Sequence, residues 1–169
     1  ADLRMGVIGC GSIAEIAHFP SIQKTAQAKL AAVCDVRAEA AESAARRWNA
    51  EQFFTDYREM FDKAKLDAVI IASPNNVHRN QAVAAARAGV HVIVEKPLAV
   101  TNYEAWDIVE ACRKAGVKLM VGCDRRFWTH NQWAKQLIET GVIGKLLMSR
   151  SSLHEHWHNY QNHVARTGF

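Results

Sequence analysis

A glycine-rich turn near the N-terminus constrains the fold more than any other feature of this sequence. The motif Gly-Cys-Gly-Ser-Ile-Ala at residues 9–14 follows the apolar run from Leu3 to Ile8, and the stretch from about Ser12 across Pro20 is typical of a helix. The first glycine permits a tight turn, the second lets another group approach the backbone, and the final alanine permits close packing of helix on strand. The motif therefore predicts a strand, a sharp turn and a helix in immediate succession.

Short apolar runs alternate with helix-like stretches over most of the chain. Strands are expected at residues 3–8, 29–34, 52–54, 67–72, 90–94 and 117–121. Helices are expected from about Ser12, over 38–48, after Asp56, over 77–88 and over 102–115. Continuous β-branched runs such as residues 69–71 indicate parallel strands that are buried on both faces. Right-handed crossovers then favour an α/β fold with a Rossmann-type doubly wound parallel sheet, in strand order 3-2-1-4-5-6.

The pattern of the sequence changes after Gly122. A helix is expected over residues 131–139, and Gly141 and Gly144 lead into a strand-like run over residues 145–153. We therefore expect a Rossmann domain over residues 1–127. Residues 128–169 are expected to form a connecting helix followed by the first strand of a truncated second α/β domain.

The glycine motif also predicts a ligand. A helix N-terminus offers backbone N–H donors and positive potential to a phosphate group. Asp35 ends the next strand, 21 residues after Ala14, where a carboxylate can accept hydrogen bonds from a ribose. Because Asp35 would repel a 2′-phosphate, NAD is favoured, and the nearby Arg37 leaves NADP as an alternative. The residues of the motif expected to bind the dinucleotide are Gly9, Gly11, Ser12, Ile13 and Ala14.

Three further segments each follow a predicted strand, at the edge of the sheet where ligands bind in open α/β folds. They are Ser-Pro-Asn-Asn-Val-His at residues 73–78, Glu-Lys-Pro at 95–97 and Gly-Cys-Asp-Arg-Arg-Phe at 122–127. With the glycine motif in front of them, the chain resembles the Gfo/Idh/MocA family of sugar and polyol oxidoreductases. The resemblance extends from Met5 to about Ser151.

The first and third of these segments belong to the cofactor site in the family. The resemblance implies that Pro74 and Asn75 line the cofactor cleft, together with Ser73 and His78 of the same segment. It also implies that Arg126 reaches the nicotinamide side of that cleft.

The second segment carries the implied chemistry. Glu95 would lie beside the nicotinamide ribose, Lys96 would hold the substrate hydroxyl, and Pro97 would close a turn that is often cis in this family. A cationic Lys96 can stabilise the alkoxide that develops as hydride leaves an alcohol, so we expect it to be catalytic. The implied reaction is hydride transfer between NAD(P) and a hydroxyl-bearing carbon of a sugar, polyol or related cyclic alcohol. The alternative is a non-catalytic dinucleotide-binding sensor, which has no need of Lys96.

The chain also departs from the family pattern. Relatives carry a second α/β domain that supplies an acid/base histidine and much of the sugar pocket, and no matching histidine motif follows residue 145 here. We therefore expect a fragment that binds NAD but does not turn over by itself. Its expected partners are a small carbohydrate or polyol and, through the missing domain, further copies of the chain.

The segment His-Glu-His-Trp-His at residues 154–158 fits the zinc-protease pattern H-E-x-x-H. That chemistry requires a helix, so that two histidines four residues apart share one face. The preceding residues 145–153 contain no helix cap and are typical of a strand that runs into a loop. We therefore expect no catalytic metal and interpret the segment as a polar surface that faces a sugar; incidental metal binding by His154, His156 and His158, which would share one face of an extended segment, is the alternative.

Composition excludes several other classes of protein. The 21 basic and 17 acidic residues give a net charge of +4 without a basic block, which is weak evidence for a nucleic-acid partner. The apolar runs are too short to span a bilayer, and no signal peptide is visible. The four cysteines form no C-x-x-C pair, and we interpret them as reduced thiols of a cytoplasmic protein.

Overall fold

The computed structural model describes residues 2–152 and 154. The chain divides into two compact units, Ala1–Gly122 and Cys123–Phe169, and each is described by itself. The sequence had suggested a division at residue 127, after the Asp-Arg-Arg-Phe segment. The structure instead assigns that segment to the second unit.

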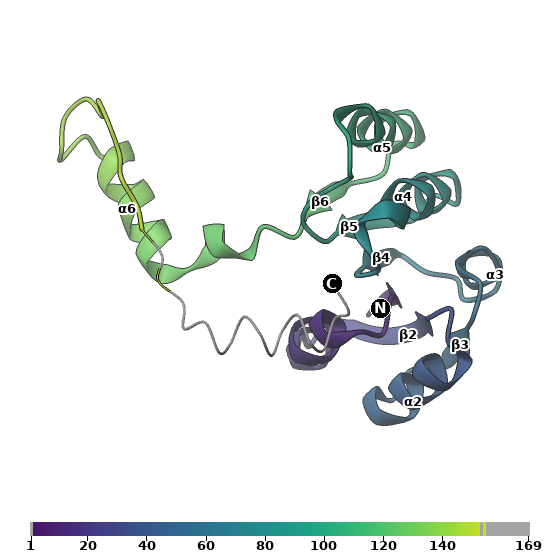
Figure 1. Ribbon diagram of the computed structural model, residues 1–169. Coiled ribbons are helices and arrows are strands. Elements are labelled where there is room, and N and C mark those ends of the chain that lie inside the picture. Colours follow the sequence, from purple (N-terminus) through teal and green to yellow (C-terminus); the bar gives the residue numbers. More distant parts are fainter. Residues whose placement is uncertain (1, 153, 155–169) are drawn as a thin grey trace. The chain divides into compact units, whose positions relative to one another are not determined.

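The first unit is built on one parallel sheet (Figure 1). Its six strands lie in the order β3-β2-β1-β4-β5-β6, and every neighbouring pair is parallel. This confirms the predicted fold class and strand order. The strands are β1 (Leu3–Ile8), β2 (Ala28–Cys34), β3 (Gln52–Phe54), β4 (Ala68–Ile71), β5 (His91–Val94) and β6 (Leu119–Val121).

Helices cover both faces of this sheet because side chains of the central strands alternate between two cores. On β1, Val7 packs with α1 and α2 residues such as Phe19 and Ala45, whereas Ile8 packs with α3, α4 and α5 residues such as Ile108. Burial on both faces explains the continuous apolar runs of the sequence. The helices are α1 (Phe19–Lys24), α2 (Ala38–Trp48), α3 (Tyr57–Lys63), α4 (His78–Arg87) and α5 (Asn102–Ala115).

Local signals in the sequence determine where several helices begin and end. Thr101 and Glu104 form a capping box at the start of α5, and Gly116 ends that helix in the left-handed region. Asp56 caps α3 by accepting a hydrogen bond from the backbone N–H of Arg58. None of the helices described here is long and apolar enough to cross a membrane.

The helix that follows the glycine motif is irregular. It opens with a π-helical turn, η1 (Ala14–His18), and continues as α1. Phe19 donates its backbone N–H to the carbonyl of Ala14, five residues earlier. Pro20 has no N–H to donate, which removes one bond of the regular α-helical pattern at this point. The sequence predicted the helix across Pro20 but not the extra residue in its first turn.

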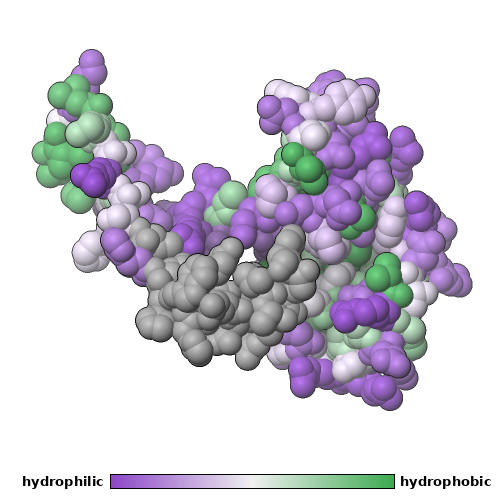
Figure 2. All heavy atoms as spheres, in the orientation of Figure 1, coloured by the Kyte–Doolittle hydropathy of each residue, from purple (hydrophilic) through white to green (hydrophobic). Residues whose placement is uncertain are grey.

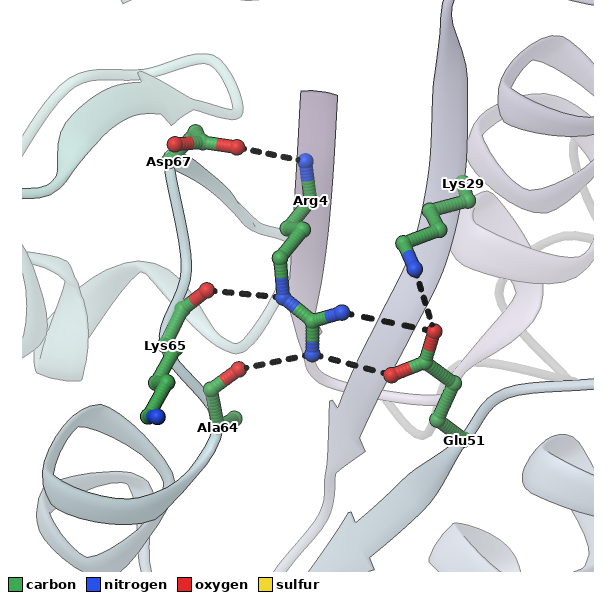
Figure 3. A network of polar contacts seen from close by, with 6 residues as sticks. All are labelled: Arg4, Lys29, Glu51, Ala64, Lys65 and Asp67. Atoms are coloured by element: carbon green, nitrogen blue, oxygen red, sulfur yellow. Dashed lines mark hydrogen bonds and ion pairs between the residues drawn. The ribbon is translucent and has the colours of Figure 1, made fainter. Parts of the chain in front are cut away.

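A polar network ties together the amino-terminal ends of the strands, at the edge opposite the ligand edge (Figure 3). Arg4 on β1 donates to the carboxylate of Glu51 at 2.9 Å and to the backbone carbonyls of Ala64 and Lys65. Lys29 on β2 pairs with the same carboxylate at 2.8 Å. Lys29, and then Arg4, hold the pKa of Glu51 below its usual value. The network therefore orders the backbone between α3 and β4.

The second unit begins with a short 3₁₀ turn, η3 (Asp124–Phe127), and the helix α6 (Thr129–Glu139). Residues 146–152 have no regular secondary structure, so the strand predicted over 145–153 is wrong for the residues that are described. A strand needs a partner for its backbone hydrogen bonds, and no described segment pairs with this one. Apolar side chains gather on α6 and the residues after it, as Figure 2 shows; the exposed ones are Trp133, Leu137, Ile138, Val142, Ile143, Leu146, Leu147 and Met148.

Candidate cofactor and active site

The loops that carry the predicted site residues leave the sheet side by side. Backbone hydrogen bonds join the residues that follow neighbouring strands: Gly9 donates to Cys34 at 2.8 Å, Glu95 to Ile71 at 2.9 Å, and Gly122 to Val94 at 2.7 Å. Ala72 likewise donates to Ile8 at 2.8 Å. The carboxyl ends of β1, β2, β4 and β5 therefore form one continuous edge. The chain order reverses between β1 and β4, which is where open α/β sheets bind ligands.

Gly9 makes the sharp turn out of β1. Its φ is +93°, a conformation that residues with a side chain rarely adopt. A Cβ atom there would lie 2.7 Å from the backbone carbonyl of Ala72 and from the backbone nitrogen of Ser73. Glycine is therefore required at this position by the protein itself, whether or not a ligand is bound.

Gly11 differs from Gly9 in this respect. A Cβ atom at Gly11 would meet no protein atom within 4 Å, so nothing in the fold requires a glycine there. The residue lies at the start of the helix, where its carbonyl accepts from Glu15 and the N–H groups that follow have no helical acceptor. An open space beside a helix N-terminus fits a pyrophosphate that approaches the backbone.

The other residues of the motif form the first turn of the helix and its contact with the sheet. Ala14 is fully buried against the sheet, so a larger side chain would push the helix away from β1. Ser12 and Ile13 form the first helical positions and are half-buried. The motif therefore has the geometry that the sequence predicted for it, while ligand binding by these five residues stays a prediction.

Asp35 lies directly after β2, next to the glycine turn. Its carboxylate accepts from the backbone N–H of Cys10 at 2.9 Å and from the backbone N–H of Arg37 at 3.0 Å. The residue is 9% exposed, so the carboxylate is held rigidly at the edge of the sheet. The side chain of Arg37 is largely exposed, and its Nε lies 3.4 Å from the same carboxylate. Asp35, which favours NAD, and Arg37, which could favour NADP, therefore lie next to each other.

The loop after β4 is ordered by side chains of α4. Ser73 donates its hydroxyl to the amide oxygen of Gln81 at 2.5 Å, and its carbonyl lies 2.9 Å from Nε2 of His78. Pro74 is exposed and Asn75 is half-buried at the start of the short 3₁₀ turn η2 (Asn75–Val77). This loop therefore presents Pro74 and Asn75 at the edge of the sheet.

His78 lies inside the protein, unlike the other residues of its segment. The sequence placed it among the cofactor-binding residues, but its side chain is fully buried. Its Nδ1 lies 3.1 Å from the carbonyl of Pro97 and its Nε2 lies 2.9 Å from the carbonyl of Ser73. Both ring nitrogens are thus engaged by backbone, so His78 joins two loops of the edge and has no free polar atom for a cofactor.

The Glu95-Lys96-Pro97 turn follows β5. The Lys96–Pro97 peptide is cis, as the family resemblance implied. Lys96 is exposed, and its backbone N–H donates to Oε2 of Glu95 at 3.1 Å. Oε1 of Glu95 lies 2.9 Å from Nε2 of His18, which comes from the π-helical turn. The turn therefore presents the exposed side chain of Lys96 at the same edge as the glycine motif and Asp35.

Sequence reasoning missed His18 and Gln81. No motif of the sequence points to either residue. The only sequence signal for either is spacing, since Gln81 and His78 lie one helical turn apart. Arg126 belongs to the second unit, where its guanidinium lies 5.9 Å from the ring of Phe127, and its role at the nicotinamide remains a prediction.

The described residues contain no group of three potential metal ligands. The histidine-rich segment at 154–158 lies outside the described residues apart from His154, so its interpretation is untested. Cys10, within the glycine turn, and Cys34, at the end of β2, are both buried. Burial, and then the negative charge of Asp35, raise the pKa of each thiol to about 12, so neither serves as a thiolate nucleophile or ligand at neutral pH.

Comparison with known proteins identifies the family. Residues 3–123 match the Gfo/Idh/MocA model of the oxidoreductase family with an NAD-binding Rossmann fold. The chain belongs to this family, as its four loop motifs indicated.

Two solved structures show a similar fold with cofactor bound. Scyllo-inositol dehydrogenase from Lactobacillus casei, with NAD(H) and scyllo-inositol, is 31% identical with a TM-score of 0.81 and matches 86% of this chain and 43% of its own. The WlbA dehydrogenase from Bordetella pertussis, with NADH and UDP-GlcNAcA, is 34% identical with a TM-score of 0.81 and matches 86% of this chain and 44% of its own. NAD is therefore the cofactor of this type of domain.

A curated relative gives the same result. Myo-inositol 2-dehydrogenase from Thermotoga maritima is 34% identical over 143 residues, which are 85% of this chain and 42% of that protein. The chain thus spans about two fifths of the length of the relatives it matches.

Proposed function

We propose that this chain is the cofactor domain of an NAD-dependent oxidoreductase that transfers a hydride between nicotinamide and a hydroxyl-bearing carbon of a sugar, polyol or related cyclic alcohol. One observation carries the proposal. The exposed ammonium of Lys96 lies at the same sheet edge as the glycine turn and the buried carboxylate of Asp35. The same edge of the sheet therefore carries a candidate dinucleotide site and a cationic group that could stabilise the alkoxide of a reacting alcohol.

The residues at the edge fit a dinucleotide. The open space at Gly11 and the free N–H groups of the helix suit the pyrophosphate, and Oδ2 of Asp35, with one backbone donor, keeps a lone pair for a ribose hydroxyl. Asp35 supports NAD over NADP because a carboxylate repels a 2′-phosphate, whereas the exposed Arg37 would be needed to attract one. When bound, the nicotinamide accepts or donates the hydride.

Lys96 acts on the substrate in this proposal. As hydride leaves the carbon, negative charge grows on the hydroxyl oxygen, and a positioned ammonium stabilises that charge and shares the proton. The hydrogen bond from the backbone N–H of Lys96 to Oε2 of Glu95 holds the backbone from which the Lys96 side chain extends. A dinucleotide-binding sensor would need the cofactor residues without this group.

Substitution of Lys96 tests the proposal. In the protein that carries this chain, NAD-linked oxidation of a panel of cyclic polyols and sugars is measured for the parent and for Lys96→Ala. We expect kcat to fall by about 100-fold, a usual scale for a positioned proton-transfer group, with little change in NAD affinity. The matched control is Lys118→Ala, an exposed lysine before β6 at the opposite edge of the sheet. An undiminished rate in Lys96→Ala would remove Lys96 from the reaction, whereas a parent protein that binds NAD but oxidises none of the panel would favour the sensor.

A further inference from the structure

We propose that His18 is a positioning residue for Lys96, acting through the carboxylate of Glu95; this inference rests on the proposed function. His18 belongs to the helix of the glycine motif, and Glu95 belongs to the turn that carries Lys96. The pair therefore links the cofactor-binding helix to the reactive turn, although the two residues are 77 positions apart in the sequence.

The two oxygens of Glu95 have separate partners. Oε1 lies 2.9 Å from Nε2 of His18, and Oε2 accepts the backbone N–H of Lys96 at 3.1 Å. A carboxylate only accepts hydrogen bonds, so Nε2 of His18 is the donor in the first of these bonds. A shift of the imidazole would therefore move the carboxylate, and with it the backbone of Lys96.

The pair is sheltered from water, which makes its geometry more definite than that of a surface ion pair. The side chains are 16% exposed for His18 and 14% for Glu95. The other pairs of the first unit, such as Arg47 with Glu15, leave at least one side chain far more exposed. Exposed pairs contribute little and are loosely held, whereas sheltered charge-assisted bonds orient their partners.

Gly122 makes room for this carboxylate. A Cβ atom at Gly122 would lie 3.1 Å from Oε1 and 3.4 Å from Cα of Glu95. Gly122 has no positive φ that would require glycine, so the close approach of Glu95 is the feature that favours a glycine there. The residue that follows β6 therefore leaves space for the carboxylate of Glu95.

The π-helical turn explains why His18 points at Glu95. A π turn inserts one extra residue into the helix, which rotates the residues that follow by about 100° relative to a regular α-helix. His18 is the last residue of that turn. Such turns are uncommon and occur often at functional sites, because they place a side chain where a regular helix would not.

His78 holds the other end of the same turn. Its Nδ1 lies 3.1 Å from the carbonyl of Pro97. Lys96 therefore lies between a residue fixed by His18 and a residue fixed by His78, and the Lys96 side chain itself takes part in neither contact. The backbone of the reactive turn is held while the ammonium stays available.

The test compares two replacements of His18 with a matched control. His18→Leu removes the donor, whereas His18→Gln keeps an N–H at the reach of Nε2. His91→Leu is the control, because His91 is a half-buried histidine at the amino end of β5 that accepts from the backbone N–H of Lys118. The backbone amide of Lys96 is followed by heteronuclear NMR on this chain, and NADH affinity and turnover are measured in the protein that carries it.

We expect the Lys96 amide resonance to shift in His18→Leu and to stay near its parent position in His18→Gln and His91→Leu. In turnover, His18→Leu should lower kcat by about tenfold, the scale of a small misplacement of a reacting group, while NADH affinity changes by less than about threefold. His18→Gln should restore most of the rate. Equal responses to His18→Leu and His91→Leu, or an unmoved Lys96 amide in His18→Leu, would overturn the inference. A parent protein that oxidises no polyol would contradict the proposed function instead, and the amide result would still decide whether His18 positions the turn.

Discussion

The two glycines of the nucleotide motif offer a direct test of how the structure separates folding from binding. Gly9 is needed by the fold, whereas Gly11 has open space beside it. We predict that Gly9→Ala lowers stability strongly and that Gly11→Ala leaves stability nearly unchanged while weakening cofactor binding. The two changes are chemically identical and lie two residues apart.

The expected loss in Gly9→Ala has two sources. An alanine at φ +93° is strained by about 1–3 kcal/mol. Its Cβ would lie 2.7 Å from backbone atoms of Ala72 and Ser73, which cannot rotate away, and overpacking of this kind costs about 1–3 kcal/mol more. A total of about 4 kcal/mol corresponds to a fall in Tm of about 10 °C for a chain of this size.

Gly11→Ala should behave differently. Replacing glycine by alanine at an unstrained position stabilises a protein by about 0.4–1 kcal/mol, and this is offset because alanine is a poorer residue at a helix N-cap. We therefore expect Tm within about 3 °C of the parent. The new methyl group would occupy the space proposed for the pyrophosphate, so NADH should bind at least about tenfold more weakly, a loss of about 1.4 kcal/mol.

Thermal unfolding followed by circular dichroism measures the first quantity, and calorimetric titration with NADH measures the second. A Tm for Gly9→Ala equal to that of the parent would refute the steric reasoning at Ala72. Unchanged NADH affinity in Gly11→Ala would show that the pyrophosphate does not approach this backbone.

Two further predictions concern Asp35 and the cysteines. Asp35→Ser should weaken NADH binding by about tenfold or more, since a charge-assisted bond contributes about 1.5–3 kcal/mol, and should narrow the preference for NADH over NADPH; an unchanged ratio in calorimetry would assign the preference elsewhere. In the native protein a thiol reagent such as Ellman's should titrate rapidly only the exposed Cys123, because Cys10, Cys34 and Cys112 are buried and the pKa values of Cys10 and Cys34 are about 12. Titration in denaturant should then reach all four thiols, and more than one fast thiol in the native state would contradict the burial.

The fold could be predicted because its signals are local. Apolar runs, helix caps and the glycine turn each act within a few residues, and the six strands of the sheet lie within two residues of the predicted bounds. The order of the strands followed from the general handedness of parallel crossovers. Among the described residues, the strand predicted over 145–153 is absent, because strand formation depends on a pairing partner, which a local pattern does not provide.

The site was harder to predict because its internal contacts are long-range. Asp35, Lys96 and the glycines could be located from their spacing and from the family resemblance. The contact of His18 with Glu95 depends on a π-helical turn, and periodicity assumes a regular helix. The burial of His78 could not be predicted from its motif, which lies at the cofactor edge, because the first turn of α4 directs its ring into the protein.

The central claim is that the edge formed by the glycine motif and Asp35 binds NAD. The most direct measurement is a calorimetric titration of this chain with NADH and with NADPH at one salt concentration. The account predicts saturable binding of one NADH per chain and weaker binding of NADPH. No saturable binding of NADH, or tighter binding of NADPH, would contradict it.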